Sequence, residues 1–224
     1  MVPAVVTFDL FSALIDSRKG GSAVFQALAD ERGWPVDGAA VYGRWDALNK
    51  EAQRQCADWV PFAELSRGAL ADAYRDLGID GDPSSDTERV LGSVSQWPLW
   101  PDVAEGLPRI SREYPVGILS NVDDNILWRT RAAAFVDAGR VFTSQRLGAY
   151  KPAPEIYHRA QQRLSPLIHV ATSPRDVQGA AAAGLTFVHL QRDGHHLDPR
   201  GPLPRHQAAD LDDVATRLRE IAQG

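Results

Sequence analysis

The sequence predicts an α/β fold: a doubly wound parallel sheet with an all-helical block inserted behind its first strand. Three observations lead to this prediction. A short apolar, β-branched run opens the chain at residues 4–8. Residues 17–96 then show helical spacing of apolar positions, without a convincing strand among them. From residue 103 onward, short apolar runs alternate with helical patterns, as is typical of βαβ units.

The first predicted strand places a carboxylate where parallel sheets bind ligands. Residues 4–8 read Ala-Val-Val-Thr-Phe, which favours a buried parallel strand. Asp9 follows at once, so we expect it at the carboxyl end of that strand. In open α/β sheets, ligands bind at this edge.

The helical block indicates an inserted cap. Segments rich in glycine, proline and aspartate separate four helical patterns, which predict helices at residues 21–32, 39–55, 61–77 and 87–96. We therefore predict two domains, a core of residues 1–16 and 97–224 and a cap of residues 17–96.

The second half of the chain supplies the rest of the sheet. Apolar runs predict strands at residues 116–119, 140–143, 167–170 and 186–190. Helical patterns between and after them predict helices at residues 103–114, 125–135, 154–164, 175–183 and 212–222. Residues 191–206 are rich in glycine, proline, histidine and aspartate, which predicts a surface loop.

Composition argues against several classes of protein. The net charge of −5 argues against an electrostatic nucleic-acid binder. The apolar start, residues 2–14, contains Asp9, lacks a basic segment and is too short to span a membrane, so we expect a cytoplasmic protein without membrane association. The single cysteine, Cys56, excludes an internal disulfide and a multi-cysteine metal site, and the six histidines show no metal-ligand spacing. A small molecule is the partner class that fits best.

Four places near predicted strand ends carry reactive groups. They are Asp9, the pair Ser120 and Asn121, Lys151, and Asp176. A parallel sheet gathers its strand ends at one edge, so these side chains are expected to converge. Each also has a structural alternative: the aspartates and Ser120 suit turns or helix N-caps, and Lys151 suits a solvated surface.

These residues lie in segments that resemble the four motifs of the haloacid dehalogenase-like superfamily, in the same order. The segments are residues 8–14 (FDLFSAL), 119–121 (LSN), 150–157 (YKPAPEIY) and 169–184. The resemblance implies a Rossmann-like core with a cap inserted after the first motif. It also implies that Asp9 forms a covalent ester with the substrate, while Ser120 and Asn121 hold an oxyanion and Lys151 neutralises charge around Asp9. Asp176 would orient Lys151, hold a metal or position the hydrolytic water.

Two departures from the phosphatases of this superfamily favour its 2-haloacid dehalogenase branch. Phe11 stands where the phosphatases have a second aspartate, and a phenyl ring cannot protonate a leaving group. Residues 170–176 carry one carboxylate, Asp176, which weakens a magnesium site. The 2-haloacid dehalogenases carry an aromatic residue at the position of Phe11 and need no metal, because halide leaves as a stable anion. Lys151 and Tyr157 match their third motif, which predicts hydrolysis of a carbon–halogen bond in a small acid without a cofactor.

The match to that branch is incomplete. That branch has a hydroxyl residue four places after the nucleophile, where this chain has Ala13, and a serine and an asparagine in the fourth motif, where it has Ala171 and Ser173. Its cap arginine follows a tryptophan, whereas here Asp46 follows Trp45 and Arg44 precedes it. Two alternatives therefore stay open: a Mg²⁺-dependent phosphatase of a small phosphomonoester, and a non-catalytic binding protein. The family often forms dimers, which makes a homodimer possible. The candidate substrate-binding residues are Phe11, Arg44, Trp45, Ser120, Asn121, Tyr157 and Ser173.

Overall fold

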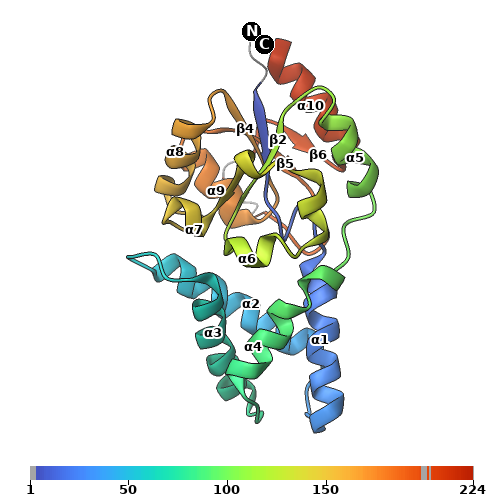
Figure 1. Cartoon of the computed structure of the whole chain (residues 1–224), viewed down its shortest axis with the longest axis vertical. Helices are drawn as coiled ribbons and strands as arrows, with labels where there is room; N and C mark the ends of the chain where they lie inside the picture. Colours follow the sequence, from blue (N-terminus) through green and yellow to red (C-terminus); the bar gives the residue numbers. More distant parts are fainter. Residues whose placement is uncertain (1–3, 198–200, 202, 224) are drawn as a thin grey trace.

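A computed structural model describes residues 4–197, 201 and 203–223 of the chain, and it contains a parallel sheet with β1 near its centre (Figure 1). The strand order is β3-β2-β1-β4-β5-β6, and every pair is parallel. The predicted α/β class and parallel sheet are therefore confirmed. β6 is a two-residue strand that the sequence did not predict, directly after the expected loop. The strands are β1 (Val5–Phe8), β2 (Val116–Ser120), β3 (Val141–Thr143), β4 (Leu167–Ala171), β5 (Thr186–Leu190) and β6 (Gln207–Ala208).

Helices flank the sheet on both sides, so its central strands are buried on both faces (Figure 1). Alternate residues of β2 belong to different apolar clusters: Ile118 packs in the larger cluster and Leu119 in the smaller one. This explains why the strands appear in sequence as continuous apolar runs rather than as alternating patterns. The main flanking helices are α5 (Val103–Ile110) and α10 (Leu211–Gln223), which contact each other, and α8 (Pro154–Arg163) and α9 (Pro174–Ala182), which do likewise.

α5 flanks the sheet, but the other helices between β1 and β2 pack on one another beyond the carboxyl edge of the sheet (Figure 1). We call them the helical cap; the division of the chain into core and cap stays a proposal, which this arrangement supports. The cap consists of α1 (Ser17–Arg32), α2 (Gly38–Gln55), α3 (Phe62–Leu77), α4 (Pro83–Gly92) and the 3₁₀ turn η1 (Val94–Gln96).

Two cap helices begin four residues before their predicted starts. α4 begins at Pro83, with the Asp82 side chain accepting from Ser84 N; proline suits the first helical position, whereas we interpreted it as part of a loop. α1 begins at Ser17 and runs through Gly20 and Gly21. A Cβ on Gly20 would lie 2.4 Å from Cγ of Trp97, so glycine is required there by the close approach of the indole.

The predicted core helices were partly wrong. Residues 125–135 form a short helix, α6 (Asp124–Leu127), and a separate 3₁₀ turn, η2 (Arg131–Phe135). The helix expected at residues 103–114 ends at Ile110 and continues as turns. Further short elements flank β3, namely η3 (Ala138–Arg140) and α7 (Ser144–Leu147), the latter begun by the Thr143 hydroxyl, which accepts from Arg146 N.

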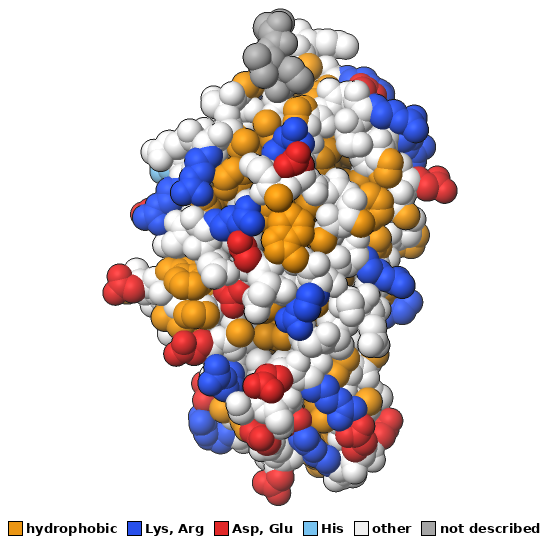
Figure 2. Space-filling view, viewed as in Figure 1, with side chains coloured by type: hydrophobic (Ala, Val, Ile, Leu, Met, Phe, Trp, Pro, Cys, Tyr) orange, Lys and Arg blue, Asp and Glu red, His pale blue; other side chains and the backbone are white. Residues whose placement is uncertain are grey.

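On the face drawn in Figure 2, basic and acidic side chains are interspersed over both the core and the cap. Among the described residues, no helix combines the length and the apolar character needed to cross a bilayer.

Candidate active site

Asp9 lies where the sequence predicted it, directly after β1 at the carboxyl edge of the sheet. Its Oδ1 accepts hydrogen bonds from Ser120 Oγ at 3.0 Å and from Lys151 Nζ at 3.1 Å. Its Oδ2 accepts from the backbone N of Ser12 at 3.2 Å and from the Ser12 hydroxyl. Both carboxylate oxygens are therefore held by donors from three different segments, which fixes the orientation of the side chain.

The surroundings of Asp9 keep it ionised. Burial raises its pKa, but the Lys151 charge, the Ser12 hydroxyl and the Lys151 hydrogen bond lower it, and together they hold the pKa of Asp9 well below its ordinary value of 3.8. The Asp9 side chain still lines the cavity described below. An ionised, oriented carboxylate that faces a cavity is suited to act as a nucleophile.

Lys151 joins Asp9 to a second buried carboxylate. Its Nζ lies 2.6 Å from Oδ2 of Asp176, whose Oδ1 accepts from the Tyr157 hydroxyl at 2.8 Å. Burial raises the pKa of Asp176, but Lys151 and His169 outweigh it, so that pKa is also lowered. Tyr157 is fully buried and does not line the cavity, so the structure places it behind Asp176 rather than against a substrate, contrary to our expectation.

His169 belongs to this group, although sequence reasoning assigned it no role. Its Nε2 lies 3.1 Å from Asp176 Oδ2 and 3.4 Å from Lys151 Nζ, and its Nδ1 lies 3.0 Å from the Thr7 hydroxyl. Thr7 and His169 are paired in the register of β1 and β4. In the sequence, the signal for this contact is one polar residue in each of two otherwise apolar strands, Thr7 in β1 and His169 in β4. The signal can be used only when it is known that these two strands are neighbours in the sheet.

The Asn121 side chain bonds to the backbone of Lys151 and not to Asp9. Its Oδ1 accepts from Lys151 N at 2.7 Å, and its Nδ2 donates to Lys151 O at 3.0 Å and to Gln53 Oε1 of the cap at 2.8 Å. Ser173 lines the same cavity and caps α9, its hydroxyl accepting from Asp176 N at 3.4 Å. The site residues of the core are thus bonded to one another and, through Gln53, to the cap.

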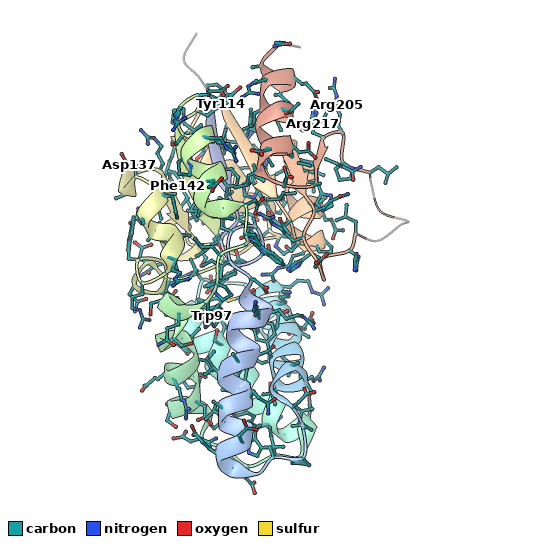
Figure 3. All side chains as sticks on the ribbon, turned by 90° about the vertical axis from the view of Figure 1, so that its right-hand side faces the viewer. Trp97, Tyr114, Asp137, Phe142, Arg205 and Arg217 are labelled. Carbon is teal, nitrogen blue, oxygen red and sulfur yellow. The ribbon has the colours of Figure 1, made fainter. Side chains whose placement is uncertain are left out.

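A cavity of about 620 Å³ opens above Asp9 between the core and the cap. Its apolar wall is aromatic: the ring centroid of Phe11 lies 6.3 Å from that of Phe62 and 5.7 Å from that of Trp97, which is found at the junction of core and cap (Figure 3). Trp45 also lines it, with its indole N–H bonded to Ser66 O at 2.9 Å. The expected contributions of Phe11 and Trp45 to the cavity wall agree with this placement.

Arg44 does not join the site. It lies on the cap surface, where its guanidinium pairs with Asp76, and it does not line the cavity. Neighbouring residues of a helix point about 100° apart, so Trp45 and Asp46 can face the cavity while Arg44 turns away. Asp46 pairs there with Lys50 at 2.6 Å. The cavity has two other arginines, both of which sequence reasoning missed: the exposed Arg18 of α1, and Arg175 in the first turn of α9.

The donor set of the site is a poor one for a metal. In the described part of the chain, no three His, Cys, Asp or Glu side chains are grouped so as to hold a metal ion. Both oxygens of Asp176 are already engaged by Lys151, Tyr157 and His169. A divalent cation at Asp9 and Asp176 would have to displace the Lys151 ammonium that now lies between them.

Comparison with known proteins decides the family. The model of the haloacid dehalogenase-like hydrolases matches residues 3–184. The chain belongs to the haloacid dehalogenase-like hydrolase family. A relative in Pseudomonas sp. (strain CBS-3), (S)-2-haloacid dehalogenase 1, is 22% identical over 223 residues, covering 96% of both chains. The predicted membership of this hydrolase family is therefore confirmed.

Solved structures of family members share the fold over nearly the whole chain. A crystal structure of a defluorinating L-2-haloacid dehalogenase is 27% identical, with a TM-score of 0.81, and the match covers 97% of this chain and 95% of that one. The L-2-haloacid dehalogenase of Xanthobacter autotrophicus, with chloropropionic acid covalently bound, is 21% identical, with a TM-score of 0.80 over 98% and 99% of the two chains. This second likeness concerns the fold alone.

Proposed function

We propose that this family member hydrolyses the carbon–halogen bond of a small 2-haloacid through an ester on Asp9, without a metal ion. The observation that carries the proposal is the setting of Asp9: an ionised carboxylate, held at both oxygens, that faces a cavity whose adjacent wall is Phe11. Halide leaves as a stable anion and needs no proton donor, so a phenyl ring beside the nucleophile suits this chemistry and not phosphate-ester cleavage.

The reaction takes two steps on this geometry. First, an Asp9 oxygen attacks the halogen-bearing carbon; a carbon–oxygen bond forms while the carbon–halogen bond breaks, and halide leaves with the bonding electrons. Then a water oxygen attacks the carbonyl carbon of the Asp9 ester, and the acyl carbon–oxygen bond breaks. The products are halide, a 2-hydroxy acid, one proton and the free Asp9 carboxylate.

The second step explains the donors around Asp9. Attack by water places negative charge on an oxygen of Asp9 itself, in a tetrahedral intermediate. Ser120, Lys151 and Ser12 already donate to the Asp9 oxygens in the resting protein, so they are in place to stabilise that charge without rearranging. Asp176 and Tyr157 act through Lys151, because they hold its ammonium group in position.

Assays of halide release and phosphate release, each with and without Mg²⁺, test the proposal. We expect halide release from 2-chloropropionate that Mg²⁺ does not change, and its loss in Asp9→Asn, because an amide is a poor nucleophile. Asp76→Asn is the matched control: it makes the same change on the cap surface, outside the cavity, and halide release is expected to persist.

Two results would contradict the proposal in different ways. Mg²⁺-dependent phosphate release from a phosphomonoester, abolished by Asp9→Asn, assigns the same nucleophile to a phosphatase. Absence of turnover with a panel of haloacids and phosphomonoesters, together with ligand binding that Asp9→Asn leaves unchanged, assigns the chain to the non-catalytic class.

A further inference from the structure

Arg175 connects the core to the cap across the cavity. It belongs to the first turn of α9, directly before Asp176, and its side chain lines the cavity that Asp9 faces. One terminal nitrogen, Nη2, donates to Gln53 Oε1 at 2.6 Å, and Nη1 donates to the backbone O of Lys50 at 3.3 Å. Both acceptors belong to α2, and both are uncharged.

The guanidinium of Arg175 has no carboxylate within salt-bridge distance among the residues that the structure describes. Two other cations of the cavity wall, Arg18 and Lys19 of α1, are exposed to solvent, and the remaining two are paired. Lys151 lies between Asp9 and Asp176, and Lys50 is neutralised by Asp46 at 2.6 Å. Burial lowers the pKa of Arg175, more than the nearby carboxylates raise it. Arg175 is partly buried, and a cation in that position without a bonded carboxylate is suited to bind an anion that enters the cavity.

We propose that Arg175 binds the carboxylate of the substrate and so sets the specificity of the site for acids. This inference rests on the proposed function, since it names the group that orients the 2-carbon toward Asp9. A guanidinium has five N–H donors in a planar fork, and the described residues accept from two of them. The remaining donors can bind a carboxylate with two parallel hydrogen bonds. Arg175 of the core thus takes the place in the cavity that we had expected the cap residue Arg44 to fill.

Gln53 fixes the position of this group. Its Oε1 accepts from Arg175 at 2.6 Å and from Asn121 at 2.8 Å, so the guanidinium is tied to the segment that also holds Lys151. The competing interpretation is that Arg175 is a latch, which serves only to close the cap on the core. The two interpretations differ in which substrates they affect: a latch acts on every ligand, whereas an anchor acts on carboxylates.

Steady-state halide release from 2-chloropropionate and from its neutral amide separates them. In Arg175→Gln we expect KM for the acid to rise about 30-fold or more, the low end of the loss when one partner of a hydrogen-bonded charge pair is removed. The value of kcat for the acid should change much less, and the KM for the amide should stay the same. Arg175→Lys should fall between wild type and Arg175→Gln, because it keeps the charge and loses the fork.

Gln53→Glu tests the same idea from the partner side. It gives Arg175 a carboxylate of the same shape as the amide it replaces. If Arg175 binds the substrate carboxylate, the new side chain occupies it and KM for the acid rises. If Arg175 only closes the cap on the core, the new ion pair strengthens that closure and KM does not rise. Arg44→Gln is the matched arginine control outside the cavity, and KM should not change.

Calorimetric binding of propionate and of propionamide keeps the inference testable if the wild type releases no halide, an outcome that refutes the proposed function alone. We expect propionate affinity to fall in Arg175→Gln by the same 30-fold or more, with propionamide unaffected. Equal losses for acid and amide, or unchanged affinity for propionate, would overturn the assignment of Arg175. A rise of KM in Lys50→Gln without one in Arg175→Gln would transfer the role to Lys50.

Discussion

Replacing Lys151 by methionine should measure how much the ammonium group of Lys151 contributes to stability by lying between two buried carboxylates. Lys151 and Asp176 have side chains only 3% and 2% exposed, and Asp9 has 13%. Removing the shared cation leaves two buried carboxylates without the ammonium group that lies between them. Breaking a buried pair in this way costs about 3–5 kcal/mol. We therefore expect the free energy of unfolding of Lys151→Met to fall by about that amount at about pH 7.

The dependence on pH gives the sharper test. In the wild type, the pKa of Asp9 is lowered in the folded state. The stabilisation that the ionised Asp9 provides is therefore present above pH 3.8, the ordinary pKa, and is lost as the pH falls toward the folded-state pKa. In Lys151→Met, burial remains without the cation and raises that pKa, so protonation favours the folded state and stability declines as the pH rises. The difference between the two proteins should therefore narrow from about pH 7 to about pH 4.

Urea unfolding at several pH values measures this difference. Lys50→Met is the matched control, because Lys50 forms an ion pair with Asp46 whose side chains are 37% and 32% exposed, and such pairs contribute about 0.2–1 kcal/mol. A loss below about 1 kcal/mol in Lys151→Met, or a loss that grows as the pH falls, would refute the proposed coupling of Lys151 to the two carboxylates.

Two further substitutions test the oxyanion donors and the junction between cap and core. Ser120→Ala removes one donor to Asp9 Oδ1, and we expect ester hydrolysis in single-turnover measurements to slow by about 10²-fold, with unchanged rates contradicting a role in the second step. Asp123 is a core side chain that caps α3, because it accepts from Phe62 N at 2.9 Å and from Ala63 N at 3.0 Å. In Asp123→Ala we expect a loss of about 1 kcal/mol of stability and faster limited proteolysis near residue 60. Unchanged cleavage would show that this contact does not hold the cap on the core.

The part of the site that follows from the sequence is the part set by the strands. Asp9 and Ser120 come at the ends of apolar runs, and Asp176 lies in the first turn of the helix that follows β4, so the parallel topology alone brings them to one edge. Lys151 was predicted through its motif, and the structure places its ammonium group between Asp9 and Asp176. The strand ends therefore predicted the centre of the site before any packing was known.

The residues that sequence reasoning missed depend on tertiary geometry. Thr7 and His169 come together because β1 pairs with β4 in one register. Arg175 and Gln53 meet only because α2 lies across the start of α9, and nothing in either segment specifies that approach. Arg44 failed as a candidate for a related reason: its direction on α2 decides whether it faces the cavity, and that direction depends on how the cap packs on the core.

The most direct test of the central claim is the fate of solvent oxygen in Asp9 itself. The protein is allowed many turnovers of 2-chloropropionate in water enriched in heavy oxygen, and the peptide that contains Asp9 is then examined by mass spectrometry. An Asp9 ester opened at its carbonyl carbon predicts heavy oxygen in the Asp9 side chain, and none in Asp176. Turnover that places heavy oxygen in the 2-hydroxy acid and leaves Asp9 unlabelled would contradict a covalent intermediate, because water would then have displaced the halide directly.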